Sequence, residues 1–478
     1  MMFYAWKWLL LVFISIKFCD GGGHECPDRE IIRPCVCTEK TQGLDIVCDG
    51  TSLPRLPVIL RMIAEKEQEI LYLKLRNIPV EKSLQSFLFD GLHIIHLIIQ
   101  NSTIITVSDA AFLGQEEKLQ SLDLAHNQLE TVPTSSIEHL SGLETLILNY
   151  NNIEDLHEGC FRGLSSLLHL SLYGNKISTI HNLAFQGFNG NLTLLNIGGN
   201  QLTFIPSRPL LGLSFIEKLQ IQDNKIVSLI PDEFIEEGFS LDTLELTNNQ
   251  IEELPKRAFS HLRINSLDLD RNRIKVIHPE AFEGVEESLR WLKLGRNKLE
   301  QIPTNSLINL TRLRQLDLNG NSISRVEKNS FHPYGHNIKF IYLQGNKISC
   351  IDPEAFQHLD SLEWLYLQSN QLEEILQETF SPILDTLQAL DIHSNPFNCD
   401  CKLVWLRDWM LTPKGKTVIS KALETKCKTP ESLRDTLIMN IPSHIKSCTS
   451  SSSILQPFFV IIVAEIFFTL ANVFATIS

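Results

Sequence analysis

The sequence has no excess of positive charge, and this excludes one broad class of function. Its 42 Lys and Arg residues are outnumbered by 56 Asp and Glu residues, which gives a formal net charge of −14 at pH 7. A chain of that charge repels phosphate backbones and anionic lipid headgroups. The sequence therefore argues against a nucleic-acid-binding function.

The sequence also lacks the common catalytic motifs. It contains no Gly-x-Ser-x-Gly segment. His24 and His157 are each followed by Glu, as in a zinc-protease motif, but the second His of that motif is missing in both places. Residues 415–417 (Gly-Lys-Thr) end like a phosphate loop, yet Met410 occupies the position that needs the first glycine. We therefore expect no enzymatic activity, no cofactor and no bound metal.

The start of the chain predicts export. Lys7 precedes the apolar run 8–16, and small residues follow at 21–23. The run is shorter than the roughly 20 apolar residues that span a bilayer, so residues 1–22 are interpreted as a cleaved signal peptide. Eleven cysteines fit the same oxidising, extracellular destination.

The end of the chain is apolar from 458 to 477, with four serines at 450–453 before it and no Lys or Arg after it. This composition favours a signal for a glycosylphosphatidylinositol (GPI) anchor, with Ser447, Ser450 and Ser451 as candidate attachment sites. An ordinary single membrane span and plain secretion stay open as alternatives, and Glu465 counts against both membrane interpretations. The expected location is the cell surface or the extracellular space.

A repeat of 23 to 25 residues occupies most of the chain. Apolar residues recur at positions 1, 4, 6 and 11, as in Leu119, Leu122, Leu124 and Leu129. Asn occupies position 9 in twelve copies: Asn127, Asn151, Asn175, Asn200, Asn224, Asn249, Asn272, Asn297, Asn321, Asn346, Asn370 and Asn395. Two earlier copies, which begin at Ile70 and Ile94, lack this Asn and bring the total to fourteen.

Strand geometry assigns a role to each repeat position. Side chains alternate along a strand, so positions 4 and 6 point into the core while positions 3, 5 and 7 point outward. The Asn bonds to backbone groups where the chain turns out of the strand. A Phe recurs near position 19 and forms a second core layer: Phe112, Phe161, Phe185, Phe234, Phe259, Phe282, Phe331, Phe356 and Phe380. Because all copies run in the same sense, their strands form a parallel sheet, about 65 Å long at 4.8 Å per strand.

Two groups of cysteines flank the repeats: Cys26, Cys35, Cys37 and Cys48 before them, and Cys399, Cys401, Cys427 and Cys448 after them. An open repeat stack needs a cap at each end. Residues 395–401 (Asn-Pro-Phe-Asn-Cys-Asp-Cys), followed by Trp405 and Trp409, closely resemble the C-terminal cap of extracellular leucine-rich-repeat proteins. The widely spaced front cap and the repeats look most like arthropod surface and secreted members, which include the non-catalytic subunit of Oplophorus-luciferin monooxygenase.

The resemblance implies an α/β solenoid, the right-handed leucine-rich-repeat horseshoe with a concave parallel β-sheet and disulfide-bonded caps. It also implies the pairs Cys26–Cys37, Cys35–Cys48, Cys399–Cys427 and Cys401–Cys448, with the two tryptophans covering the last repeat. Zinc binding by either cysteine group is the rival interpretation. The chain then divides into a signal peptide (1–22), an N-terminal cap (23–69), fourteen repeats (70–397), a C-terminal cap (398–448) and a tail (449–478).

One stretch of the outward sheet face is rich in aromatic residues. Trp291, Phe340, Tyr342, Trp364 and Tyr366 occupy positions 3 and 5 of repeats ten, twelve and thirteen. The remaining residues predicted to bind a ligand lie between or beside them: Gln315, Asp317, Gln344 and Gln368. An apolar centre with polar edges is typical of a binding hot spot. Stacking between neighbouring strands for local packing is an equal alternative.

Other side chains carry weaker signals. Glu245, Asp268, Asp270 and Asp317 make nearby strands acidic around Lys293, which indicates a solvated acidic face or, less favoured, a calcium site. Cys160 and Cys350 belong to repeats four and twelve, too far apart to pair, and are interpreted as structural free cysteines, with a reactive or intermolecular thiol as the alternative. Asn101, Asn191 and Asn309 begin N-glycosylation motifs.

Together these patterns predict a non-enzymatic extracellular scaffold for recognition or adhesion. Its partner would be an extracellular protein ligand or receptor, a second copy of the chain included, and a lipid anchor would hold it at the membrane. A secreted stabilising partner of an enzyme and a structural component of the extracellular matrix are the alternatives.

Overall fold

The computed structural model describes residues 24–51, 55–78, 82–188, 190–213, 215–232, 240–443 and 445. The predicted signal peptide, the predicted tail and the three candidate anchor serines lie outside the described residues. Within the described part of the chain, no helix has both the length and the hydropathy needed to cross a membrane. The chain divides into two compact units: Met1–Asn200 with Arg208–Leu213, and Gln201–Ser207 with Ser214–Ser478.

The first unit is built on a sheet in which each strand pairs with the next one along its face. Only the first pair, β1 with β2, is antiparallel, and the later pairs are parallel. The strands in order are β1 (Val36–Lys40), β2 (Gly43–Asp49), β3 (Glu69–Arg76), β5 (His93–Gln100), β7 (Ser121–Asp123), β8 (Thr145–Ile147), β10 (His169–Ser171) and β12 (Leu194–Asn196).

The second unit repeats this arrangement with parallel pairs throughout. Its strands in order are β13 (Lys218–Gln220), β14 (Ser240–Glu245), β16 (Arg263–Asp268), β18 (Trp291–Lys293), β19 (Gln315–Asp317), β21 (Phe340–Tyr342), β23 (Trp364–Tyr366) and β24 (Ala389–Asp391). Each of the fourteen predicted repeats thus contributes one described strand, and the predicted leucine-rich-repeat solenoid is confirmed.

The leucines of positions 4 and 6 form the core, as predicted. Leu122 and Leu124 have no exposed surface, and Leu122 pairs in register with Leu97 and Leu146 on the neighbouring strands. The same alignment runs through the second unit, where Leu292 lies between the equivalent leucines of β16 and β19. Equivalent leucines therefore stack from turn to turn, and one turn alone would bury little apolar surface.

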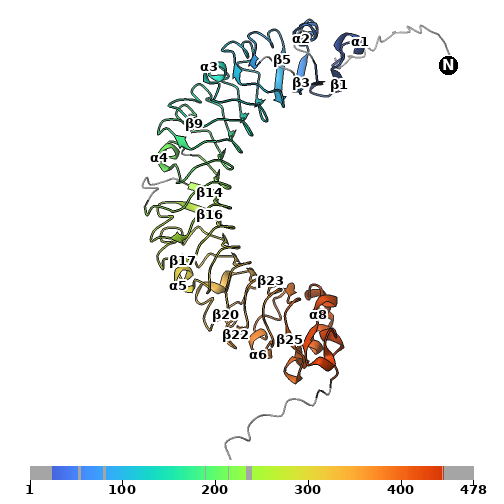
Figure 1. Ribbon diagram of the computed structural model, residues 1–478, viewed down its shortest axis with the longest axis vertical. Helices are drawn as coiled ribbons and strands as arrows, with labels where there is room; N and C mark the ends of the chain where they lie inside the picture. The colour runs from blue at the N-terminus through green and yellow to red at the C-terminus, as the bar shows by residue number, and fades with distance from the viewer. Residues whose placement is uncertain are drawn as a thin grey trace, which may run out of the picture. The chain divides into compact units, whose positions relative to one another are not determined.

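The side of each unit opposite the sheet carries short elements (Figure 1). They are the strand pairs β4 (Ser83–Leu84) with β6 (Thr106–Val107), β9 (Asp155–Leu156) with β11 (Thr179–Ile180), β15 (Glu253–Leu254) with β17 (Val276–Ile277) and β20 (Arg325–Val326) with β22 (Cys350–Ile351), and the helices α3 (Thr134–Ile137), α4 (Ser207–Leu210), α5 (Thr304–Leu307) and α6 (Gln377–Phe380). Because these elements are short, adjacent turns stay close on both sides of the core.

The predicted second core layer of phenylalanines lies beneath these short elements. The eight described members are at most 4 % exposed. Rings of adjacent turns contact one another: Phe259 and Phe282 stack with centroids 5.9 Å apart, Phe161 and Phe185 stack at 6.1 Å, and Phe356 and Phe380 meet edge to face at 5.4 Å. The ninth member, Phe234, lies outside the described residues. The second layer of the core is therefore confirmed wherever it is described.

The regular spacing of the Asn residues along the chain has a direct structural cause. Asn151 accepts a hydrogen bond from the backbone N–H of Leu129 at 3.0 Å and donates to the carbonyl oxygens of Leu124 and Leu148, also at 3.0 Å. Leu129 and Leu124 belong to the preceding repeat, whereas Leu148 belongs to the same repeat as Asn151. One side chain thus satisfies buried backbone groups of two consecutive turns, and all twelve such asparagines are at most 8 % exposed.

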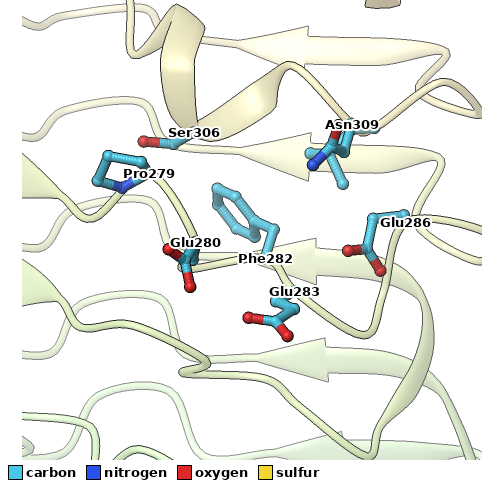
Figure 2. Close-up of a pocket in the computed structure, with 8 residues that line it drawn as sticks. Pro279, Glu280, Phe282, Glu283, Glu286, Ser306 and Asn309 are labelled. Atoms are coloured by element: carbon cyan, nitrogen blue, oxygen red, sulfur yellow. The ribbon is translucent and has the colours of Figure 1, made fainter.

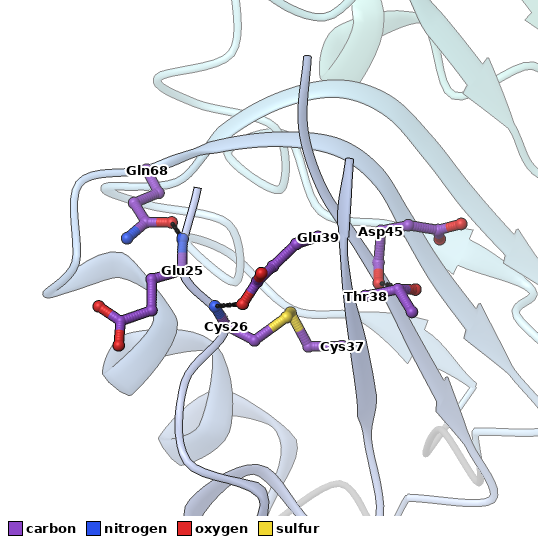
Figure 3. Close-up of a disulfide and its surroundings, with 7 residues drawn as sticks. All are labelled: Glu25, Cys26, Cys37, Thr38, Glu39, Asp45 and Gln68. Carbon is purple, nitrogen blue, oxygen red and sulfur yellow. Dashed lines mark hydrogen bonds between the residues drawn. A yellow bond between two sulfur atoms is a disulfide. The ribbon is translucent and has the colours of Figure 1, made fainter. Parts of the chain in front are cut away.

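The N-terminal cap covers the first edge of the sheet with the β1–β2 hairpin and the helices α1 (Arg29–Ile32) and α2 (Leu56–Ala64). Disulfides join Cys26 to Cys37 and Cys35 to Cys48. Figure 3 shows the first of them, with the Glu39 carboxylate accepting a hydrogen bond from the backbone N–H of Cys26 at 3.1 Å. Paired cysteines are not available as zinc ligands, so the rival zinc interpretation fails here.

The C-terminal cap consists of α7 (Val404–Leu411), α8 (Pro413–Val418) and the strand pair β25 (Phe397–Asn398) with β26 (Cys427–Thr429). Cys399 pairs with Cys427, and Cys401 is also disulfide-bonded, while its expected partner Cys448 lies outside the described residues. The indole N–H of Trp405 donates to the carbonyl oxygen of Ile375 at 3.0 Å, so this tryptophan covers the thirteenth repeat.

The twelve asparagines at position 9, which we call the Asn ladder, lead to a prediction about stability. Replacing Asn151 by Ala leaves several buried backbone groups without partners and should lower the free energy of unfolding by about 2 to 4 kcal/mol. Chemical denaturation followed by circular dichroism measures the change. The matched control is Asn152→Ala, because Asn152 bonds to the preceding repeat through its backbone N–H, which donates to Leu129 and is kept in the variant. Equal losses in the two variants would show that the ladder does not hold the turns together.

Candidate functional site

The predicted aromatic residues gather on the outward face of three strands in the second unit. Trp291 lies in β18, Phe340 and Tyr342 lie in β21, and Trp364 and Tyr366 lie in β23. Strand pairing aligns Phe340 with Trp364 and Tyr342 with Tyr366. The alternation of side chains then brings all five rings to one face. We call these five residues the aromatic cluster.

The rings of the aromatic cluster form a continuous chain of contacts. Tyr342 and Tyr366 stack with centroids 5.2 Å apart, and Phe340 and Trp364 form a T-shaped pair with centroids 4.9 Å apart. Trp364 meets Tyr366 at 6.5 Å, and Trp291 stacks on Phe340 at 6.1 Å. Such geometries are favourable beyond the apolar area that they bury.

The contact between Trp291 and Phe340 crosses an intervening strand. Both residues pair in register with Gln315 of β19, so their backbones lie two strand spacings apart, or about 9.6 Å. Because their ring centroids are only 6.1 Å apart, the two side chains lean toward each other across the position of Gln315. The rings therefore connect repeats ten, twelve and thirteen into one apolar surface.

Exposure gives support to both interpretations of the aromatic cluster. Trp364 is 37 % exposed, whereas the other four rings are half-buried. The rings cover one another, as local packing requires, and still present apolar surface to the solvent. Two polar groups beside them lack partners: the Oε1 atoms of Gln344 and Gln368 are buried and accept no hydrogen bond within the described residues.

Carboxylates lie on the strands next to the aromatic cluster. Asp268, Lys293, Asp317 and Tyr342 are successive register partners across β16, β18, β19 and β21. Lys293 Nζ lies 2.8 Å from Asp268 Oδ2, and Asp270 Oδ1 accepts a hydrogen bond from the backbone N–H of Gly295 at 2.7 Å. We call Asp268, Asp270 and Asp317 the acidic cluster.

Gly295 allows this close arrangement. A methyl group on its Cα would lie 2.3 Å from Asn319 Nδ2 and 2.8 Å from Asp270 Oδ1. Asn319 in turn donates from Nδ2 to Asp317 Oδ1 at 2.6 Å. A glycine at position 7 of the tenth repeat therefore lets the side chains of repeats nine and eleven approach each other over its backbone.

The acidic cluster perturbs its own ionisation. Burial, together with the negative charges of Asp317 and Asp268, raises the pKa of Asp270 to about 6. Burial also raises the pKa of Asp317. Burial alone would lower the pKa of Lys293, but its hydrogen bond to Asp268 and the nearby carboxylates raise it. The single ammonium group therefore does not compensate all three carboxylates.

The other residues singled out in the sequence lie in different surroundings. Glu245 is neutralised, because Lys218 Nζ lies 2.7 Å from its Oε1. Among the described residues no group of three or more His, Cys, Asp or Glu side chains is arranged to hold a metal ion, so nothing in them favours the calcium interpretation. Cys160 is buried and unpaired, and burial raises the pKa of its thiol to about 12, whereas Cys350 is unpaired and exposed.

A second set of rings on the first unit was not predicted from the sequence. Tyr72 stacks on His96 with centroids 4.6 Å apart, and His126 stacks on Tyr150 at 4.5 Å. Burial lowers the pKa of His96, so its imidazole is mainly neutral at physiological pH. Tyr72 and His96 share register on β3 and β5, so the position rule that identified the aromatic cluster would have found this pair.

A pocket lies away from the sheet face, where helix α5 meets the preceding turn. It encloses about 270 Å³ and is lined by Phe282, Asn309 and three glutamates, Glu280, Glu283 and Glu286. Figure 2 shows Phe282 at its centre with the carboxylates around it. Glu280 is held by Lys256, whose Nζ lies 2.5 Å away. Asn309, the third glycosylation candidate, is thus on a different side of the turn from the aromatic cluster.

Sequence comparison places the repeats in a known family. The leucine-rich repeat family model matches residues 93–153, 141–202, 239–286, 263–323, 311–372 and 336–397, which together cover more than half of the chain.

Two curated relatives match part of the chain. The Pongo abelii protein named transforming growth factor beta activator LRRC32 is 32% identical over 206 residues, which are 41% of this chain and 31% of that protein. Human leucine-rich repeat-containing protein 3B is 27% identical over 133 residues, 28% of this chain and 46% of that protein. The chain therefore spans about a third to a half of the length of these relatives.

Solved structures show the same architecture. A chain of the Toll–Spatzle complex of Drosophila superimposes with a TM-score of 0.61 at 20% identity, covering 79% of this chain and 51% of that chain. A chain of the mouse RP105/MD-1 complex gives a TM-score of 0.61 at 21% identity, covering 78% and 73% respectively. These likenesses establish the fold.

The ionisation of Asp270 predicts a pH dependence of stability. Its pKa is higher in the folded state than the usual value near 3.9, so the folded state binds more protons between about pH 4 and 6 and loses stability as the pH rises through that window. Asp270→Asn keeps an acceptor for Gly295 and removes the charge. We expect it to be more stable than wild type by about 1 kcal/mol at neutral pH, after allowance for solvent screening.

Thermal melts of both proteins across this pH range measure the effect. The difference in melting temperature should shrink as the pH falls from about 7.5 toward 4, because the wild-type carboxyl then becomes neutral as well. A difference that stays constant with pH would contradict the raised pKa. Asp109→Asn, at an exposed site on the first unit, should change stability by less than about 0.5 kcal/mol.

Proposed function

Because the chain belongs to the leucine-rich-repeat family, we propose that it is a non-enzymatic extracellular scaffold that binds another protein through the sheet face of its second unit. The observation that carries this proposal is the aromatic cluster, in which five rings make one continuous apolar surface with polar groups at its edges. Surfaces of this composition are where binding energy concentrates in protein interfaces.

The surroundings of the aromatic cluster support a protein partner over a small molecule. Its rings lie on three strands of one sheet, β18, β21 and β23, and the pocket at Phe282 is small and lies elsewhere. The two structural likenesses come from structures named as the Toll–Spatzle complex and the RP105/MD-1 complex, and each name joins two components. A recognition or adhesion role at the cell surface follows as part of the same proposal.

The glycosylation candidates agree with this assignment. The side chains of Asn101, Asn191 and Asn309 are all exposed. None of them belongs to the strands that carry the aromatic cluster. A glycan on Asn309, which is in the same unit as the aromatic cluster, would leave the strands of that cluster uncovered.

The binding proposal is tested by removing two rings. The full-length chain, expressed through the secretory pathway, is used to probe an array of extracellular proteins, and the affinity of the partner found is measured by surface plasmon resonance. Replacing Trp364 and Tyr366 together by Ala should weaken binding by about tenfold or more.

The matched control removes an aromatic ring elsewhere. Phe204 is 54 % exposed and lies outside the sheet, so Phe204→Ala should leave the affinity within about twofold of wild type. Unchanged affinity in the Trp364 and Tyr366 variant, with its melting temperature preserved, would rule out this face as the binding site.

The proposal includes a GPI anchor on Ser447, Ser450 or Ser451. Phosphatidylinositol-specific phospholipase C should then release the protein from cells that express the full chain, and mass spectrometry of the released C-terminus should find the modified serine. The control replaces the apolar tail 458–477 by a transmembrane helix with a basic flank, and this variant should resist the enzyme. Retention of the wild-type protein would favour a single span, and its appearance in untreated medium would favour secretion.

A further inference from the structure

The acidic cluster and the aromatic cluster adjoin on the same sheet face. Asp317 in β19 pairs in register with Tyr342 in β21, so their side chains leave the sheet from adjacent strands about 4.8 Å apart. The two side chains also influence each other, because burial raises the pKa of Tyr342, and then Tyr366 and the negative charge of Asp317 raise it further. A ligand on the rings therefore also meets the carboxylates.

The acidic cluster carries an unbalanced charge. Lys293 bonds to Asp268, and no other cation forms an ion pair with the cluster within the described residues. Arg271 and Arg296 follow Asp270 and Gly295 in the chain, but their side chains are exposed and neither pairs with these carboxylates in the described structure. Three carboxylates against one ammonium leave two negative charges when all are ionised.

Several hydrogen-bond acceptors in this region have no partner among the described residues. Asp270 receives a donor only at Oδ1, and Asp317 receives its two donors, both from Asn319, at Oδ1. The Oδ2 atoms of both residues accept no bond from the described residues, and neither do the buried Oε1 atoms of Gln344 and Gln368. A complementary partner must therefore bring donors and positive charge. Arg and Lys side chains bring both and carry no acceptor.

We propose that the partner binds through a protein segment that places an Arg or Lys side chain on the acidic cluster and a neighbouring apolar side chain on the aromatic cluster. This inference rests on the proposed function. The charge complementarity selects this occupant over an acidic protein, which would add negative charge to the cluster. The spacing allows it, because residues close in sequence can reach two adjacent strands. The face of Tyr342 adds a favourable cation–π surface at the junction.

The probe is a library of random dodecapeptides displayed on phage and selected on the full-length chain. Recovered sequences should be enriched in Arg or Lys within a few positions of Trp, Tyr, Leu or Met. The best peptide is then synthesised with a fluorescent label, and its dissociation constant is measured by fluorescence anisotropy. Recovery of only cation-free sequences, or of none, would overturn the proposal.

A change in the peptide isolates the charge without altering the protein. Replacing its Arg by citrulline keeps the shape and removes the positive charge, and should weaken binding to wild type by about tenfold or more. The Asp270→Asn and Asp317→Asn double variant should bind the two peptides almost equally, since it lacks the two carboxylates that attract the positive charge of the peptide. Equal binding of both peptides to wild type overturns the proposal whatever the variants do.

The control and the other outcomes separate this proposal from the proposed function. The Glu283→Gln and Glu286→Gln double variant removes the same charge at the pocket of Figure 2, and its affinity for the peptide should stay within about twofold of wild type.

Binding that is lost with Trp364 and Tyr366 but unchanged without Asp270 and Asp317 would contradict the cationic partner and keep the binding face. Binding that ignores all four residues would sink both. Displacement of the peptide by millimolar calcium would assign the acidic cluster to a metal and overturn the proposal.

Discussion

The fold depends on one side-chain amide in each of twelve turns. Where the chain leaves a strand, three backbone groups from two consecutive turns face an interior that contains no ladder partner. A single Asn satisfies them: Asn346 accepts from the N–H of Ile323 and donates to the carbonyl oxygens of Leu318 and Leu343. The bonds reach into the preceding turn, so they fix the register of each strand on its neighbour as well as the shape of the turn. Equivalent leucines of neighbouring strands then lie side by side, because the strand register decides which side chains meet.

Because the core positions and the Asn hold the turns together, the residues on the outward face are not needed for folding. Positions 4, 6, 9 and 11 hold the turns together, and positions 3, 5 and 7 contribute little to the core. Side chains there vary from turn to turn without loss of the fold: aromatic rings in repeats twelve and thirteen, carboxylates in nine and eleven, and histidine with tyrosine near the start of the chain. A repeat scaffold of this kind can therefore present clusters of different chemistry on the sheet face of each unit.

The features that follow from the repeat period and from the alternation of side chains along a strand were predictable from the sequence. Periodicity located the core leucines and the Asn ladder, and alternation placed Trp364 and Tyr366 on the same face. The features that depend on side-chain conformation were not. No pattern showed that Trp291 and Phe340 meet across Gln315, since that contact rests on rotamers of residues two strands apart. Gly295 carried no signal because its role is the space it leaves for Asn319 and Asp270. The stacked pair of Tyr72 and His96 was not predicted, although both residues occupy position 3 of adjacent repeats and follow the same alternation.

Two carboxylates on the same sheet show the difference between structural and functional use of charge. Glu245 has Lys218 and Gln220 as partners, both at 2.7 Å, and its charge is matched within the protein. Asp270 lies among Asp268 and Asp317, receives one backbone N–H, and has its pKa raised to about 6, so its ionised form at neutral pH costs folding stability. A neutral side chain would avoid that cost, and the glycine beside it is what makes the crowding sterically feasible. Such a cost is consistent with a role outside folding, because a bound cation would match the charge that the fold leaves unmatched.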